Sequence, residues 1–334
     1  MRFSKMISTI DTHTMGEPTR IVTGVPSLKG STMVEKKQYL IEKMDYIRTT
    51  LMHEPRGHRD MFGAIIAQPT VEGANLGVIF MDGGGYLNMC GHGTIGTVTA
   101  AIETGMMEAI EPMTEIVMDT PAGIVNARAT VKDGLVGEVS FINVPSFLYK
   151  GDVEVDVPKV GKIVIDIAFG GSFFALVKAK DLGLEIVPEN GREISKIGLR
   201  IRQAVNEQIE IEHPILSRIN TCDLVKFYSE PACGSDADVR NVVVFGDGQI
   251  DRSPCGTGTC AKLATLYAKG KIKEGETLRI ESILGTQFKG KITGTMELDG
   301  IQAVIPEITG SAYITGFNTL VIDERDPVKH GFIL

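Results

Sequence analysis

The chain has 334 residues, of which 43% are hydrophobic and 23% are charged, and its formal net charge is −8. This composition excludes disorder, collagen and coiled coil as descriptions of the whole chain, and the length favours two domains. An acidic chain without a dense Lys/Arg block is not expected to bind nucleic acid, because phosphate binding needs a basic face. No apolar run reaches the roughly 18 residues of a membrane helix, and the N-terminus lacks the apolar stretch of a signal peptide, so we expect no membrane partner and a cytoplasmic location.

Most of the chain predicts short strands separated by Gly, Pro and Asp. The clearest strand patterns lie at residues 19–23, 76–81, 123–127, 138–142, 163–167, 173–177, 241–245, 277–280 and 314–321. Helical spacing of apolar residues predicts helices at 35–49 and 194–209. Residues 94–103 and 259–269 are small and apolar almost all round, which predicts buried helices. Several strands for each helix indicate the α+β class.

An internal repeat begins at each of the two buried helices. Cys90 opens the sequence C-G-H-G-T, and Cys255 opens C-G-T-G-T. Each motif runs into an apolar helix, and a glycine, Gly105 or Gly270, follows fifteen residues after each cysteine. The two copies are 165 residues apart, which is close to half of the chain. We infer two related domains, each with one helix that begins at a cysteine.

A glycine-rich turn at a helix start favours the binding of an anion. The first N–H groups of a helix have no intrahelical partner, and the helix dipole adds partial positive charge. Such a site suits a carboxylate or a phosphate. The same position lowers the pKa of a cysteine thiol from about 8.5 to roughly 3.5–7.5.

Two such cysteines facing one carboxylate predict stereoinversion by two bases. One thiolate removes the α-proton from one face, and the other thiol delivers a proton to the opposite face, as general acid–base catalysis requires. The amides of both helices would stabilise the enediolate charge that develops. The reaction requires no cofactor.

Three other interpretations of these motifs are less favoured. Residues 91–96 match the G-x-G-x-x-G of dinucleotide-binding proteins, but the preceding strand is expected to end near Met81, and no βαβ alternation surrounds the motif. A hydrolase that uses Cys90 and His92 is disfavoured, since residues two apart at a helix start seldom face each other. A non-catalytic carboxylate-binding module would use the same amides without needing a cysteine twice.

The remaining cysteines and histidines predict structural roles. Cys260 falls inside an apolar helix, and Cys222 and Cys233 do not precede a helix. The cysteines form no C-x-x-C, so neither a zinc ribbon nor a redox pair is expected. The histidines lack metal-ligand spacing, although His58 is a candidate for the border of the cleft; the four considered are His13, His53, His58 and His213.

The two cysteine motifs resemble the signatures of the proline racemase family. They are MCGHGTIG at residues 89–96 and DRSPCGTGT at residues 251–259. The resemblance covers essentially the whole chain, and further matching segments lie at 11–14, 54–58, 60–63, 82–85, 170–174, 281–285 and 310–316. Paired motifs of this kind are highly specific to this family.

The resemblance implies a diaminopimelate-epimerase-like fold, in which two pseudo-symmetric domains each wrap a bent sheet around a central helix. The site then lies between a first domain of residues 1–130, with 311–334 returning to it, and a second domain of residues 131–310. The resemblance also implies an isomerase that needs neither pyridoxal phosphate nor metal and forms a homodimer.

The resemblance further implies roles for individual residues. Cys90 and Cys255 would be the catalytic pair, and the dehydratases of the family carry Thr in place of the second cysteine. Asp251 would accept from the ring ammonium of the substrate. The carboxylate would be bound by Gly91, His92, Gly256 and Thr257.

Two phenylalanines bear on the choice of substrate. By resemblance, Phe62 and Phe245 would wall an apolar pocket for an unsubstituted pyrrolidine. They would leave a ring hydroxyl unpaired, which is costly in a buried site. We therefore expect interconversion of L- and D-proline, with 4-hydroxyproline 2-epimerisation as the alternative. From other classes, an amino-acid-binding protein and, more remotely, an NAD-linked oxidoreductase stay open.

Overall fold

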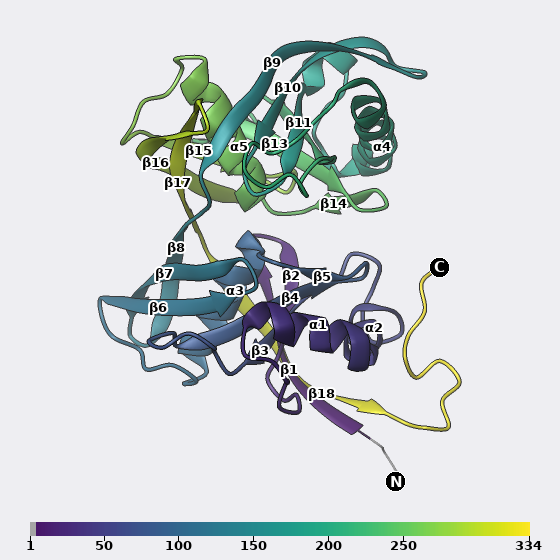
Figure 1. Cartoon of the computed structure of the whole chain (residues 1–334), viewed down its shortest axis with the longest axis vertical. Coiled ribbons are helices and arrows are strands. Elements are labelled where there is room, and N and C mark those ends of the chain that lie inside the picture. The colour runs from purple at the N-terminus through teal and green to yellow at the C-terminus, as the bar shows by residue number, and fades with distance from the viewer. Residues whose placement is uncertain (1–4) are drawn as a thin grey trace. The chain divides into compact units, whose positions relative to one another are not determined.

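The computed structural model describes residues 5–334, which divide into two compact units. Unit 1 contains residues up to Phe141 together with Gly310–Leu334, and unit 2 is Ile142–Thr309. The boundary expected near residue 130 falls within a strand of unit 1, and residues 311–334 lie in unit 1 (Figure 1).

Unit 1 is built on one mixed sheet with a buried helix. Its strands are β1 (Lys5–Thr14), β2 (Glu17–Val22), β3 (Phe62–Ala67), β4 (Leu76–Asp82), β5 (Tyr86–Leu87), β6 (Met113–Thr120), β7 (Gly123–Lys132), β8 (Leu135–Ile142) and β18 (Ala312–Ile322). They pair in the order β18-β1-β2-β3-β4-β6-β7-β8, and β5 pairs with β4. The pairs β2–β3 and β4–β6 are parallel and the others are antiparallel.

Unit 2 repeats this arrangement. Its strands are β9 (Ser146–Val157), β10 (Gly161–Phe169), β11 (Phe173–Lys178), β12 (Cys222–Ser229), β13 (Val239–Phe245), β14 (Gln249–Asp251), β15 (Thr277–Glu281), β16 (Gln287–Leu298) and β17 (Ile301–Gly310). They pair in the order β9-β10-β11-β12-β13-β15-β16-β17, with β14 on β13, and β17 returns to β9. The parallel pairs β11–β12 and β13–β15 correspond to those of unit 1.

Each unit contains one of the two repeated helices. Helix α3 (Gly91–Glu103) lies in unit 1 and α5 (Gly256–Ala268) lies in unit 2, and each has 13 residues. Both end at the predicted glycines, because Gly105 (φ 73°) and Gly270 (φ 67°) adopt left-handed backbone conformations that favour glycine. Small side chains let the sheet strands pack closely around both helices, and almost every residue of α3 is buried. The structure confirms the α+β class.

The other helices follow the predictions with one difference. Helix α4 (Gly191–Gln208) confirms the predicted helix at 194–209 and packs on β12 and β13. The single helix predicted at 35–49 is instead two helices, α1 (Met33–Lys43) and α2 (Tyr46–Met52). The helix ends at Met44, whose backbone (φ −139°, ψ 19°) leaves the helical conformation, and the Asp45 carboxylate accepts from the Arg48 guanidinium at 2.8 Å across the first turn of α2. Two short 3-10 helices, Ala179–Leu182 and Pro188–Asn190, precede α4.

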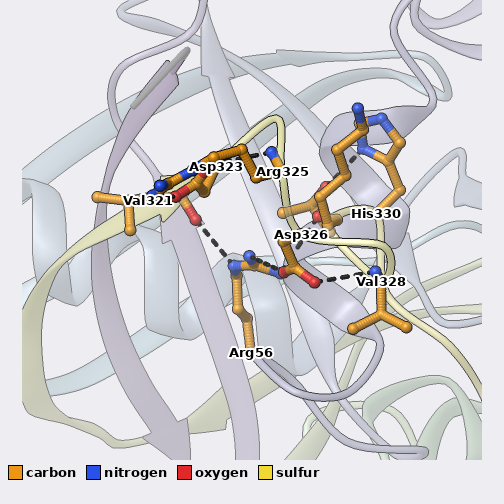
Figure 2. A network of polar contacts seen from close by, with 9 residues as sticks. Arg56, Val321, Asp323, Arg325, Asp326, Val328 and His330 are labelled. Carbon is orange, nitrogen blue, oxygen red and sulfur yellow. Dashed lines mark hydrogen bonds and ion pairs between the residues drawn. The ribbon is translucent and has the colours of Figure 1, made fainter. Parts of the chain in front are cut away.

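Arg56 ties the segment after β18 to unit 1 (Figure 2). Its Nε donates to the carbonyl of Val321 at 3.0 Å, and its guanidinium also reaches the carbonyl of Lys329 and the carboxylate of Asp326. Arg56 therefore fastens the C-terminal segment across a separation of more than 260 residues in the sequence. No helix among residues 5–334 is long and apolar enough to cross a membrane.

Candidate active site

The first cysteine site lies at the start of α3. Cys90 is the N-cap residue, with an extended backbone (φ −146°, ψ 121°), and its side chain is 8% exposed. Its carbonyl accepts from the N–H of Thr94 at 2.9 Å, which closes the first helical turn. The N–H groups of Gly91, His92 and Gly93 precede that bond and are oriented outward, as at any helix N-terminus.

Cys90 and His92 contact each other. The Sγ atom of Cys90 lies 3.4 Å from Nδ1 of His92, and the ring of Phe62 meets the imidazole edge-on with 4.6 Å between the ring centroids. The expectation that Cys90 and His92 would not face each other is wrong. The expectation assumed that Cys90 has a helical backbone. Cys90 instead has the extended backbone of an N-cap residue, which places its side chain over the first turn of the helix.

The second cysteine site lies at the start of α5 and has a different backbone. Cys255 is the N-cap residue with φ 64° and ψ 108°, a left-handed value that costs about 1–3 kcal/mol for a residue with a side chain. Asp251 accepts from the N–H and the hydroxyl of Ser253, and the Ser253 hydroxyl accepts from the N–H of Cys255 at 3.1 Å. This chain of hydrogen bonds holds the strained residue in place.

Burial and charge both act on the Cys255 thiol. Burial and the nearby Asp251 carboxylate raise the pKa of Cys255 to about 12. Lys226, the N–H of Gly258 and the hydroxyl of Thr257 act in the opposite direction, since each favours the thiolate. The pKa of Cys255 thus lies above the ordinary value of a thiol, so the lowering that its position at a helix start predicts is not found at this cysteine.

A glycine lies beneath each sulfur. A Cβ at Gly93 would stand 3.2 Å from Cys90 Sγ, and a Cβ at Gly258 would stand 3.2 Å from Cys255 Sγ. These distances are tighter than ordinary contacts, so a side chain at either glycine would force the sulfur to shift by a few tenths of an ångström. The glycines of the repeat thus leave room for the sulfur and also leave the N–H groups at the helix start uncovered.

The other predicted site residues divide between the two units. Asp251 is 6% exposed at the end of β14, and Gly256 is buried at the start of α5. Thr257 is half-buried, with its hydroxyl 3.7 Å from Cys255 Sγ. Phe245 is half-buried at the end of β13, in the same unit as Cys255. Unit 1 holds Cys90, Gly91, His92 and Phe62.

The remaining candidates differ in burial. Cys260 is buried within α5 and accepts from Asn143, and Cys222 is buried in β12, which fits a structural role for both. Cys233 is exposed, and His58 is exposed in the loop before β3. Among residues 5–334, no three His, Cys, Asp or Glu side chains gather as metal ligands would.

Two residues that act on Cys255 were not predicted from the sequence. Ser253 links Asp251 to the backbone of Cys255, and its place between them in D-x-S-x-C is a signal that could have identified it. Lys226 is distant in the sequence, and only the pairing of β12 with β13 brings it to this site.

Comparisons with known proteins show what the chain is similar to. The family model described as proline racemase matches residues 9–333. The chain is 59% identical to the proline racemase of Clostridioides difficile, with full coverage of both chains. It is 55% identical to the proline racemase of Acetoanaerobium sticklandii, with 99% of each chain covered. A hydroxyproline epimerase from Agrobacterium vitis, solved with bound trans-4-hydroxy-L-proline, aligns with a TM-score of 0.90 at 34% identity and covers 100% of this chain and 96% of its own.

Proposed function

The chain belongs to the proline racemase family and is an isomerase, and we propose that it interconverts L-proline and D-proline with Cys90 and Cys255 as the two acid–base groups. The supporting observation is that each unit presents one buried cysteine as the N-cap residue of a 13-residue helix. Two such thiols would supply the two acid–base groups that inversion of a single carbon needs.

The proposed reaction moves two protons and breaks no other bond. The thiolate of one cysteine takes the α-proton and becomes a thiol. The thiol of the other cysteine gives its proton to the opposite face of the α-carbon and becomes a thiolate. The product is the mirror image of the substrate, and the next turnover in the reverse direction uses the same two groups with exchanged roles.

Charge develops on the substrate carboxylate while the α-carbon is planar. The outward amides at the starts of α3 and α5 would bind this enediolate, and their alignment with the helix dipoles would stabilise it. Asp251 would accept from the ring ammonium of proline. The paired ammonium would offset the negative charge of Asp251, which is one of the causes that raise the pKa of Cys255. Substrate binding would therefore lower the pKa of Cys255 and favour its thiolate.

A chiral assay of L-proline without added cofactor tests the proposal. We expect D-proline to accumulate to an equal mixture and, in D₂O, deuterium to enter the α-carbon. An amino-acid-binding protein would incorporate no deuterium, and an oxidoreductase would need a nicotinamide. Pyrrole-2-carboxylate, which is planar like the transition state, is expected to inhibit and to protect both cysteines from alkylation.

The alternative is 4-hydroxyproline 2-epimerisation, the activity named for the Agrobacterium vitis structure. The aromatic rings of Phe62 and Phe245 disfavour it, because neither ring accepts or donates a hydrogen bond to a ring hydroxyl. Assaying L-proline beside trans-4-hydroxy-L-proline, with the same enzyme preparation, decides between the two. A higher kcat/KM for the hydroxylated substrate would favour the alternative.

The assembly and location belong to the same proposal. We propose a cytoplasmic homodimer, since the proline racemase family usually forms homodimers. Light scattering of the purified protein would give twice the mass of one chain, and cell fractionation would recover activity in the soluble fraction. A monomeric mass or a membrane-bound activity would contradict these two points.

A further inference from the structure

A fully buried lysine lies behind the second cysteine site. Lys226, on β12, is 0% exposed, and its ammonium donates a hydrogen bond to the side-chain oxygen of Asn241 on β13. Burial of an ammonium is costly unless other charges compensate it. Lys226 therefore needs an explanation beyond its hydrogen bond to a neutral amide.

Strand register aligns Lys226 with the second cysteine site. Lys226 pairs with Val243 on β13, and Val243 pairs with Asp251 on β14, so the three residues form one row on one face of the sheet. Val243 packs in the same apolar cluster as Cys255 and Ala261 of α5. The row thus faces the start of α5.

The equivalent row in unit 1 holds no charge. There β3, β4 and β5 pair as β12, β13 and β14 do, and the corresponding residues are Ala64, Phe80 and Leu87. Ala64 and Phe80 are 0% exposed, and the Phe80 ring reaches the position beneath Cys90 that Gly93 leaves open. The row in unit 1 therefore packs without a lysine. Of the two rows, only the row in unit 2 carries charged residues.

Several ionisable groups face Lys226 from the elements around it. Among the charged groups that act on it, Cys255 has the largest effect, and Asp251 and Cys260 follow. Each would be negative when ionised and would favour the ammonium. Lys262 on α5 repels it, and burial lowers the pKa of Lys226 to about 8, so the ammonium persists at neutral pH. Lys262 itself lies over the ring of Tyr228, 3.2 Å from the centroid.

We propose that Lys226 is the internal counter-charge of the Cys255 thiolate, a positioning residue that acts through Cys255. When Cys255 loses its proton, the ammonium of Lys226 offsets the new charge and opposes the repulsion from Asp251. The two thiols then have different partners. Cys90 contacts the imidazole of His92, and Cys255 is stabilised as a thiolate by the ammonium of Lys226. This inference rests on the proposed function for its role in catalysis.

Alkylation of the two cysteines tests the proposal without substrate. Iodoacetamide is added to the full-length protein between pH 7 and pH 10, and peptide mass spectrometry follows Cys90 and Cys255 in the same sample. In Lys226→Met, we expect Cys255 to react about tenfold more slowly than in the wild type at pH 7, where Lys226 carries its charge, which corresponds to a shift of one unit in the pKa of Cys255. The difference should shrink toward pH 10, because Lys226 loses its proton near pH 8. The rate at Cys90 should be unchanged, which shows that the protein is folded.

Two further variants make the outcome decisive. Lys226→Gln keeps a donor for Asn241 but no charge, and it should slow Cys255 to a similar extent. Lys262→Met removes another buried lysine of unit 2, which is largely uncharged above its pKa of about 7, and should leave Cys255 as reactive as before. Equal Cys255 rates in the wild type and both Lys226 variants, or an equal slowing in Lys262→Met, would overturn the proposal.

The test separates this inference from the proposed function. A wild-type protein that fails to racemise proline would refute the racemase, while the thiol titrations would still report on Lys226. If racemisation occurs and Lys226→Met leaves the Cys255 titration unchanged, the racemase stands and the counter-charge does not.

Discussion

The sulfur of Cys90 lies 3.4 Å from Nδ1 of His92, whereas the sulfur of Cys255 lies 3.7 Å from the hydroxyl of Thr257, which occupies the equivalent place in the repeat. The backbones differ as well, with φ −146° at Cys90 and φ 64° at Cys255. A repeated sequence therefore supports two chemically distinct thiols. This asymmetry is compatible with the proposed reaction, because there each thiol would serve as acid in one direction and as base in the other.

Replacement of either N-cap cysteine tests the two-base assignment. Cys90→Ser and Cys255→Ser should each lower kcat for proline racemisation by at least roughly 100-fold, the lower end of a general acid–base contribution, because a serine hydroxyl is a far weaker acid than a thiol. A chiral chromatographic assay measures the loss. Near-normal racemisation by either single variant would contradict the assignment.

Cys260→Ala is the matched control for these variants. Cys260 is a buried cysteine of α5, five residues after Cys255, and its sulfur accepts from Asn143 at 3.1 Å. We expect racemisation within about threefold of the wild type and a destabilisation of about 1 kcal/mol from the lost hydrogen bond. Chiral assay and urea unfolding measure the two effects. A loss comparable to that of Cys255→Ser would assign Cys260 a role in the reaction.

Phe245→His tests the apolar wall proposed for the pocket. An imidazole at the end of β13 can pair with a ring hydroxyl, so the ratio of kcat/KM for trans-4-hydroxy-L-proline to that for L-proline should rise at least tenfold. Phe317→His, at an exposed phenylalanine of β18, is the control and should leave the ratio unchanged. If both variants keep the wild-type ratio, Phe245 does not set specificity.

Gly170→Ala tests the support of α5 by the sheet. An added Cβ would stand 2.2 Å from the carbonyl oxygen of Thr257 and 2.6 Å from the nitrogen of Ala261, and both atoms are backbone. The first turn of α5 has to move, so we expect a destabilisation of about 1–3 kcal/mol and a lower kcat. Gly294→Ala in β16 adds a Cβ at an ordinary 3.6 Å contact and should change neither quantity appreciably. Equal thermal unfolding of the two variants would contradict the tight packing.

Lys262 should make the free energy of unfolding depend on pH. Burial lowers its pKa from 10.5 to about 7, so between these values the unfolded chain binds a proton that the folded chain does not. The free energy of unfolding should therefore rise with pH across this window by at most about 1.4 kcal/mol per pH unit relative to Lys262→Met. Urea unfolding of both proteins at pH 7, 8 and 9 measures the difference. A constant difference would show that Lys262 does not titrate in this range.

The sequence by itself determined the α+β class, half of the strands, and the two helices with their cysteines and closing glycines. It could do so because these features depend on local patterns: alternation in the strands, small residues in α3 and α5, and left-handed glycines at their ends. The break between α1 and α2 was missed, since helical spacing continues through Met44 and Asp45 while the backbone of Met44 (φ −139°) leaves the helical conformation.

Only the tertiary structure decided the surroundings of each thiol. The contact of Cys90 with His92 depends on an extended N-cap backbone, and the strained φ of Cys255 depends on hydrogen bonds through Ser253. Lys226 reaches the second site because strand pairing joins residues that lie 25 positions apart in the chain, from Lys226 through Val243 to Asp251. No periodicity in the sequence encodes which strands become neighbours, and the charge around a thiol depends on those neighbours.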